Sequence, residues 1–198
     1  DQIILLAHLI GDGCYLARQP LHYTNADENC LKIVDEVAMR QFGTNNRLVK
    51  QKSWYHLYLS APEKLTHGKR NPIAKWLDDL GIFNQRSGEK QVPVEIFSLN
   101  NEKIALFLHH LFATDGGLTK SSGQWRLHYA SKSKALIDDI IHLLLRLGIH
   151  SRIRYNQKKG YDVVYDLCIT SRDEQLKFLN DVGIFGAKEK NVKAATSA

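Results

Sequence analysis

LFLHHLFATDGG, residues 106–117, and LLAHLIGDG, residues 5–13, decide the fold of this chain. Each is an apolar run with helical spacing that ends on Asp-Gly, at Asp12 and at Asp115. An acid is disfavoured at the C-terminal end of a helix, because that end carries the negative pole and unpaired carbonyl groups. A divalent cation reverses this penalty, since it can bind the carboxylate and the last free carbonyls together. A single copy is explained by a turn in which the glycine ends the helix, but two copies indicate a paired site.

The surroundings of the two motifs form an internal repeat. LHYTN at residues 21–25 matches LHYAS at residues 127–131, and WLDDLGIF at residues 76–83 matches FLNDVGIF at residues 178–185. The two Asp-Gly motifs are 103 residues apart, and the matches follow in the same order at nearly the same offset. This pattern predicts that one α-β-β-α-β-β-α unit was duplicated and fused.

Apolar periodicity and turn residues place the elements of each half. The polar, aperiodic segment NQRSGEKQVP, residues 84–93, predicts a linker, at about residues 84–99. We therefore expect an α+β fold with two pseudo-symmetric halves, residues 1–98 and 99–198, whose antiparallel sheets surround a central pair of motif helices. The expected helices are residues 3–13, 28–42, 73–80, 101–114, 134–147 and 173–182, and the expected strands are residues 14–18, 21–25, 47–52, 54–60, 118–120, 124–131, 151–156 and 161–170.

Composition indicates a folded protein with a polyanionic partner. The 198 residues are 43% hydrophobic and carry a formal net charge of +6, with a pI near 9.2. Three cysteines at wide spacings form no Cys-x-x-Cys pair, which argues against a zinc or redox centre. We see no targeting signal and no apolar run near the ~18 residues of a membrane helix, so we expect an intracellular protein.

The two motifs resemble those of a monomeric LAGLIDADG homing endonuclease of the type found in inteins. The resemblance implies that the two motif helices pack side by side and that the last acid of each motif, Asp12 and Asp115, binds catalytic metal. A small residue normally stands five positions before each acid. Ala7 fits this pattern, whereas His110 departs from it. We read His109 and His110 as packing or surface residues, because adjacent helix positions point in different directions.

The implied activity is a double-strand break in a long, nearly palindromic DNA target, by divalent-metal-dependent hydrolysis of phosphodiester bonds. The backbone carbonyls of Gly11 and Thr114 stand beside the acids as further metal ligands. A lysine near each site is also implied: Lys90, in the segment KQVP, for the first half, and Lys188 or Lys190 for the second, where no proline follows. The expected cofactor is Mg²⁺, with Mn²⁺ able to substitute and Ca²⁺ supporting binding without cleavage.

Alternation along the strands predicts which side chains face DNA. The register between strands is open by one residue in the first half, and a solvated polar sheet face is the alternative reading. Lysines at predicted turns are expected to contact phosphates, and the acid pairs Asp78-Asp79 and Asp138-Asp139 are expected on the solvated back of each half. The candidate DNA-binding residues are Arg18, His22, Thr24, Arg47, Lys50, Lys52, His56, Lys120, Arg126, His128, Arg152, Arg154, Asn156, Lys158 and Lys159.

Members of this family that bind nucleic acid without cleaving it, the RNA maturases and DNA-binding regulators, are the alternative function. Both motif acids and Lys90 favour the enzyme. A complete self-splicing intein requires a terminal Cys or Ser and a final His-Asn, which Asp1 and Ala198 do not supply. We therefore expect an endonuclease domain without its splicing domain, a monomer whose partner is double-stranded DNA, with no protein or membrane partner implied.

Overall fold

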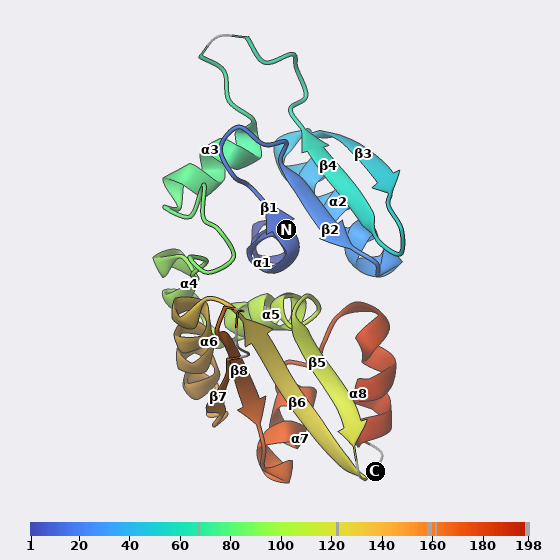
Figure 1. Ribbon diagram of the computed structural model, residues 1–198, viewed down its shortest axis with the longest axis vertical. Helices are drawn as coiled ribbons and strands as arrows, with labels where there is room; N and C mark the ends of the chain where they lie inside the picture. Colours follow the sequence, from blue (N-terminus) through green and yellow to red (C-terminus); the bar gives the residue numbers. More distant parts are fainter. Residues whose placement is uncertain (67, 122, 158–159, 161, 197–198) are drawn as a thin grey trace.

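Two helices cross at the middle of the molecule, α1 (Gln2–Asp12) and α5 (Asn101–Leu111), each packed against the other at the boundary between two stacked units (Figure 1). This arrangement is seen in a computed structural model, which describes residues 1–196 apart from residues 67, 122, 158–159 and 161. We call the part from α1 to α3 the first unit and the part from α5 to α7 the second unit.

The first unit forms a four-stranded antiparallel sheet in the order β1-β2-β4-β3, with helices on one face. Asp27 caps the long helix α2 at its start, and Gly43, with a φ of 62°, ends it in the left-handed conformation. The elements after α1 are β1 (Gly13–Cys14), β2 (His22–Asn25), α2 (Glu28–Phe42), β3 (Asn45–Lys50), β4 (Tyr55–Ser60) and α3 (Pro72–Asp79).

The second unit repeats this order, and its sheet is β5-β6-β8-β7, again antiparallel. A short helix, α4 (Val94–Phe97), lies in the connection between the units, and a 3-10 turn, η1 (Gly186–Lys188), leads to the final helix α8 (Glu189–Thr196). The elements after α5 are β5 (Gly116–Ser121), β6 (Gln124–Ser131), α6 (Lys134–Arg146), β7 (Arg152–Asn156), β8 (Val164–Ile169) and α7 (Arg172–Asp181).

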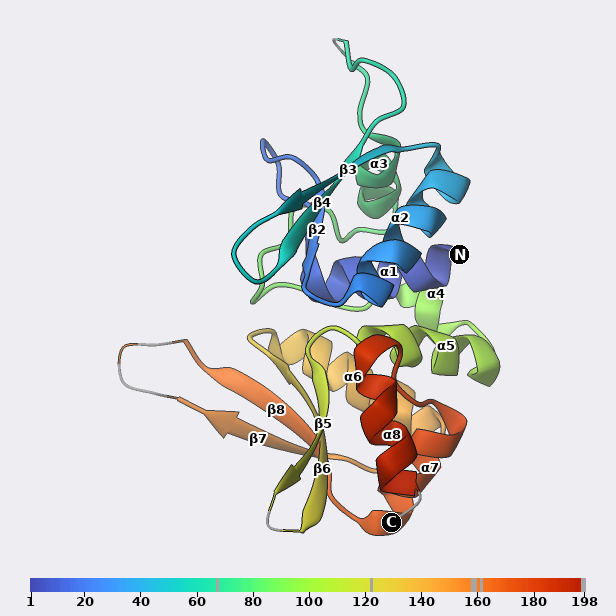
Figure 2. The same cartoon turned by 90° about the vertical axis from the view of Figure 1, so that its right-hand side faces the viewer.

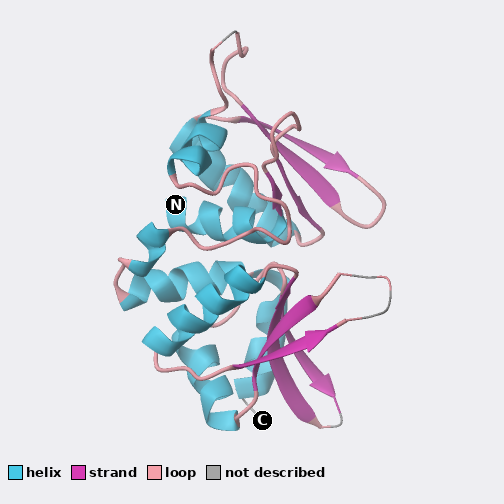
Figure 3. Ribbon diagram, turned by 60° about the vertical axis from the view of Figure 1, so that its left-hand side comes forward, coloured by secondary structure: helices cyan, strands magenta, loops and turns pink. Residues whose placement is uncertain are grey.

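One face of each sheet is buried by helices, and the other is open. Leu57 and Leu59 of β4, and Leu127 and Tyr129 of β6, join the hydrophobic core, as strand alternation requires. Figure 3 shows helices gathered on one side of both units and strands on the other. The two open faces therefore lie on the same side of the molecule, as Figure 2 also shows.

The predicted fold class is confirmed, and the differences from prediction are local. The second motif helix ends at Leu111 rather than Thr114, because the next residues form tighter turns: the Thr114 amide and hydroxyl both donate to the Leu111 carbonyl. Strand β1 is two residues long, and Arg18 beyond it has a φ of 64° that breaks an extended chain. Helices α4 and α8 were not predicted.

The two motif helices approach each other closely at Gly11. A Cβ atom placed on Gly11 would lie 2.1 Å from the Thr114 hydroxyl oxygen, so any side chain at this position would force Thr114 or a helix to move. His110, the residue that departs from the family pattern, is also in this interface and is 4% exposed. The crossing is thus close despite a histidine where a small residue was expected, because glycine supplies the contact at another position.

Candidate active site and nucleic-acid interface

The two motif acids line one cavity of about 350 Å³ at the boundary between the units. Asp12 is the last residue of α1, and Asp115 lies in the turn that follows α5. Lys90, from the connection between the units, lines the same cavity. Two segments that are about a hundred residues apart in the sequence therefore present their carboxylates to a shared space.

A lysine reaches the backbone around each acid. The Lys90 ammonium group donates to the Gly11 carbonyl at 2.7 Å and to the Gly13 carbonyl at 3.1 Å, and the side chain is buried. Lys188 donates to the Thr114 and Gly116 carbonyls, both at 2.6 Å. These bonds satisfy carbonyls that a helix end leaves unpaired.

The two lysines that the sequence left as alternatives lie in different places. Lys188 reaches the turn at Asp115, whereas Lys190 is exposed on α8. The carbonyls of Gly11 and Thr114, predicted as metal ligands, each accept a lysine hydrogen bond.

Burial changes the acidity of the site, and the charge of Asp115 adds to the shift of Asp12. Burial, and next the negative charge of Asp115, raise the pKa of Asp12 to about 7, although both lysines oppose the shift. Burial likewise raises the pKa of Asp115 against the two lysines. Burial also lowers the pKa of Lys90, which the two acids partly restore. The charged forms of both acids are therefore disfavoured, and a cation between them would favour their ionisation.

The carboxylates of Asp12 and Asp115 and the backbone carbonyls near them are oxygen ligands. Such ligands fit a divalent cation such as Mg²⁺, which prefers oxygen and keeps several bound waters. Among the residues that the structure describes, no group of three or more His, Cys, Asp or Glu could hold a metal ion. Any ion held by Asp12 and Asp115 would complete its ligands from backbone carbonyls, water and a bound phosphate.

A chain of buried and part-buried hydrogen bonds connects Asp12 with the centre of the helix crossing. The Asn25 amide nitrogen donates to the Asp12 carboxylate at 2.8 Å and to the Tyr23 hydroxyl at 2.9 Å. The Tyr23 hydroxyl is 2.9 Å from His8 Nδ1, and His8 Nε2 is 3.1 Å from His110 Nδ1. In the neutral His8 tautomer that carries its proton on Nε2, Tyr23 donates to His8 and His8 donates to His110.

Sequence reasoning missed this network. Its signal was present in LHYTN, where Tyr23 and Asn25 alternate with His22 and Thr24 on a strand next to the motif helix. In the other copy of the repeat Ser131 stands where Asn25 stands, so the surroundings of the two acids differ.

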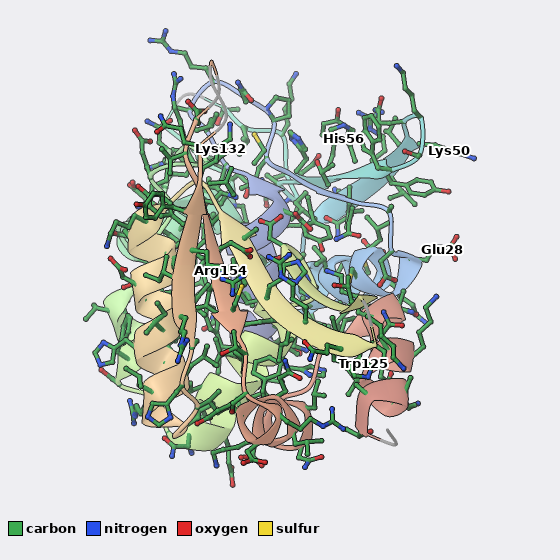
Figure 4. All side chains as sticks on the ribbon, turned by 60° about the horizontal axis from the view of Figure 1, so that its bottom comes forward. Glu28, Lys50, His56, Trp125, Lys132 and Arg154 are labelled. Carbon is green, nitrogen blue, oxygen red and sulfur yellow. The ribbon has the colours of Figure 1, made fainter. Side chains whose placement is uncertain are left out.

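The open face of the second sheet is basic, as predicted. The register pairs His128 and Arg152 with Cys168, and Arg154 with Asp166, so these residues share one face with Arg126. His128 lies over Gly117, where a Cβ would come within 2.6 Å of its ring. Figure 4 labels Arg154 and Trp125 on this sheet.

Asp166 was missed as a residue of this face. It is 5% exposed and accepts an ion-paired hydrogen bond from the Arg126 guanidinium. The Asp166 carboxylate thus holds the Arg126 guanidinium on the open face. The position of Asp166 on this face could have been predicted, because Asp166 and Cys168 alternate with the core residue Leu167.

An aromatic row crosses the open face of the first sheet. The rings of His22 and His56 are 4.8 Å apart, and those of His56 and Tyr58 are 6.0 Å apart and stacked. The Arg47 guanidinium lies 4.8 Å from the centre of the Tyr58 ring. Thr24 contacts His56 through its hydroxyl at 3.2 Å. These predicted residues therefore come together.

The remaining candidates lie elsewhere. Lys50 lies opposite Tyr55, whereas its neighbour Val49 lies opposite His56. Since successive residues of a strand face opposite sides of the sheet, Lys50 is not on the open face with His56, and its assignment to that face was wrong. Lys120 belongs to β5 rather than a turn, because β5 continues to Ser121, and its ammonium is 5.5 Å from the Trp125 ring centre. Arg18 and Lys52 are exposed in loops. Asn156 ends β7, and Lys158 and Lys159 lie outside the described residues.

One acid of the two pairs was misplaced, because Asp138 is exposed as expected and Asp139 is not. Asp78 and Asp79 are exposed, as predicted. Asp139 is instead half-buried and accepts from the Val92 amide at 2.9 Å, because the segment that carries Lys90 packs against α6.

Solved structures share this arrangement. The homing endonuclease I-DmoI in complex with DNA and Mn aligns over 91% of this chain and 94% of that one, with a TM-score of 0.61 and 20% identity. The homing endonuclease I-WcaI bound to its DNA recognition sequence aligns over 97% of this chain and 86% of that one, with a TM-score of 0.61 and 15% identity. This chain therefore has the LAGLIDADG homing endonuclease fold. Residues 102–183 match the family model described as a LAGLIDADG-like domain, so the resemblance inferred from the motifs is confirmed.

Segments of several larger proteins also match. A replicative DNA helicase DnaB from Rhodothermus marinus is 40% identical over 98% of this chain and 21% of its own length. From Methanocaldococcus jannaschii, a replication factor C small subunit is 25% identical over 95% of this chain and 10% of its length, and a glutamine–fructose-6-phosphate aminotransferase is 24% identical over 96% and 16%. The chain spans about a fifth or less of each relative. No helix in the described part of the chain is long and apolar enough to cross a membrane.

Proposed function

We propose that this protein is a site-specific homing endonuclease that makes a double-strand break in a long, nearly palindromic DNA target. The observation that carries the proposal is the shared cavity. Two motif acids from duplicated units face it, and a lysine lies beside each acid. The cavity lies between two sheets whose open faces carry basic and aromatic side chains on one side of the molecule.

Asp12 and Asp115 would hold the divalent cations, Mg²⁺ in the proposal, which supply charge neutralisation at phosphorus and activation of water. The structures of I-DmoI with DNA and Mn, and with DNA and Ca, support divalent metal use. Lys90 and Lys188 would stabilise the negative charge that develops on the phosphate, since each brings an ammonium group to the edge of the site. Bound phosphate would compete with the backbone carbonyls for these ammonium groups.

The two open sheet faces would contact the two halves of the target. Arg152 and Arg154 can donate to base edges in the major groove, where arginine bonds guanine in bidentate fashion. The repeat would supply one DNA-contacting unit for each half of the target within one chain, with the division near residues 98 and 99. The protein would therefore act as a monomer. It would act wherever its target DNA lies.

We also propose that the chain is the endonuclease part of an intein. Its relatives carry the matching segment within a helicase, a replication factor subunit and an aminotransferase, and the segment makes up a small part of each. Three proteins with unrelated activities have no shared need for such a segment. An inserted element that moves between genes accounts for this distribution.

The test is incubation of the protein with a random-target DNA library and Mg²⁺, followed by sequencing of the new ends. We expect ends at one long site with both strands cut, and none with a protein in which Asp12 and Asp115 are both asparagine. Specific binding without cleavage in either Mg²⁺ or Mn²⁺ would instead identify a non-cleaving DNA-binding protein. Preferential binding of RNA would identify a maturase.

A further inference from the structure

The segment that carries each active-site lysine is tied to the opposite unit. Lys188 follows the second unit, yet the amide of its neighbour Ala187 donates to the Asp27 carboxylate of the first unit at 2.6 Å. Asp27 is also the cap of α2, because its other oxygen accepts from the Asn29 amide at 2.9 Å. The Asp27 carboxylate thus caps the start of α2 and also binds the backbone of the segment that carries Lys188. In Figure 1 the chain before α8 lies next to α2.

The same relationship exists on the other side of the molecule. Lys90 follows the first unit, and its carbonyl accepts from the Ser133 hydroxyl of the second unit at 2.5 Å. Ser133 is fully buried and caps α6 by accepting from the Leu136 amide at 3.2 Å. The Val92 amide adds a second bond to α6, to Asp139 at 2.9 Å.

Asp27 and Ser133 occupy the same position in the repeat, six residues after Leu21 and Leu127. They make their ties with opposite chemistry, since Asp27 accepts from an amide and Ser133 donates to a carbonyl. Two unlike side chains at equivalent positions hold equivalent segments. The tie is therefore a property of the architecture and not of one side chain.

The backbone at Gly186 packs closely against Asp27 and Cys30. Gly186 has a φ of 81°, and a Cβ placed on it would lie 2.4 Å from the Asp27 carboxylate and 3.2 Å from the Cys30 sulfur. The backbone before Lys188 therefore approaches α2 as closely as a glycine permits. Lys188 lies two residues further along and reaches four carbonyls of the turn at Asp115.

We propose that Asp27 and Ser133 are positioning residues that act across the boundary between the units: Asp27 sets Lys188 beside Asp115, and Ser133 sets Lys90 beside Asp12. Each site then depends on a helix cap of the opposite unit, so neither lysine is in place unless the two units are docked. The placement of the lysines is independent of the reaction, whereas its consequence for cleavage rests on the proposed endonuclease function.

Two variants separate the ties. Asp27→Asn keeps the size of the side chain but replaces one of the two accepting oxygens with an NH2 group, which cannot accept from the Asn29 or the Ala187 amide that faced that oxygen. Ser133→Ala removes the hydroxyl that donates to the Lys90 carbonyl. Ser171→Ala is the matched control, because Ser171 caps α7 in the same way, by accepting from the Glu174 amide at 3.2 Å. A thermal melt checks that each variant folds. If Ser133→Ala does not, Asp139→Asn loosens the same segment at Val92.

The first measurement needs no DNA. Limited acetylation of the folded proteins, followed by mass spectrometry, reports the accessibility of each lysine amine. We expect Asp27→Asn to increase labelling of Lys188 severalfold with Lys90 unchanged, Ser133→Ala to do the reverse, and Ser171→Ala to change neither. Equal increases at both lysines, or no increase, would overturn the proposal.

The second measurement resolves cleavage by strand. Asp27→Asn should leave DNA nicked in one strand, and Ser133→Ala should leave it nicked in the other, whereas a general loss of stability slows both cuts alike. Equal slowing of both cuts in folded variants would overturn the catalytic consequence. If the unmodified protein cuts no DNA, the endonuclease proposal fails, while the labelling still decides whether the caps position the lysines.

Discussion

Asn25 donates a hydrogen bond to the Asp12 carboxylate at 2.8 Å, and the matching position beside Asp115 is a serine, Ser131. The Asn25 amide is itself held, because its oxygen accepts from the Asp27 amide at 2.7 Å. Asp12 therefore has a fixed orientation from a residue that the second unit does not reproduce. The two acids are equivalent in the repeat but not in their surroundings.

The first prediction follows from this difference. Asn25→Ser should slow cleavage of the strand served by Asp12 by about 10–100-fold, the usual cost of losing a residue that orients a metal ligand. The other strand should be cut at the original rate. A labelled duplex, resolved by strand on a denaturing gel, measures both rates. Equal effects on the two strands would show that Asn25 acts through folding instead.

The second prediction concerns the acids themselves. Asp12→Asn or Asp115→Asn should leave folding and DNA binding intact, and relief of charge repulsion should raise stability by up to ~1 kcal/mol. Cleavage should fall by several orders of magnitude, since an amide cannot neutralise a divalent ion. A thermal melt, a gel shift in Ca²⁺ and a cleavage assay in Mg²⁺ measure the three properties. Unchanged cleavage would show that Asp-Gly in each motif only ends a helix in a turn and does not bind catalytic metal.

The third prediction concerns pH and the buried histidine pair. Burial lowers the pKa of His8 and of His110 to about 3, and the neighbouring His109 adds to both shifts. An unfolded histidine has a pKa of about 6.5, so between these values the unfolded state binds protons that the folded state does not. The folded state is therefore penalised for neither histidine above about pH 6.5, and stability is lost as pH falls below that value, on the order of 3 kcal/mol for each histidine by pH 4.5.

Urea unfolding at several pH values tests this expectation. His8→Leu should show a shallower dependence of unfolding free energy on pH than the unmodified protein, even if its stability at pH 7 is lower. His150→Leu is the matched control, because His150 is exposed and pairs with Glu174 at the surface. A pH dependence that His8→Leu leaves unchanged would mean that other groups control acid unfolding.

The fourth prediction tests the helix crossing. Gly11→Ala should destabilise the protein by about 1–3 kcal/mol, because the added methyl group overlaps the Thr114 side chain and forces the helices apart. Thr114→Gly in the same chain removes the overlap and should recover part of the loss. Chemical denaturation of the two single variants and the double variant gives the coupling between the residues. Additive effects would place the strain elsewhere.

The fifth prediction concerns salt. Residues 101–198 carry 15 Lys and Arg against 10 Asp and Glu, whereas residues 1–100 carry 12 against 11. Each neutralised phosphate contributes about 0.9 to the slope of log affinity against log salt. Footprinting at rising salt should therefore find the half-site under residues 101–198 protected longest. Protection that disappears first from that half-site would refute the charge argument.

The sequence by itself determined the duplicated α+β architecture and the two motif acids. Periodicity and Asp-Gly at the ends of apolar runs are local signals, and a repeat of near-constant offset reports on the whole chain. The strand faces of the second sheet followed from alternation, because Arg126, His128, Arg152 and Arg154 needed no knowledge of distant contacts. Lys90 came from the resemblance to a known family.

Tertiary structure decided which residues meet. The approach of Lys188, and not Lys190, to the turn at Asp115 depends on where η1 docks against α2, and the side of the sheet that Lys50 occupies depends on a cross-strand register. The network from Asp12 through Asn25 and Tyr23 to His110 joins segments from both units. Such pairings are set by packing between residues far apart in the chain, and the spacing of residues along a single element carries no information about them.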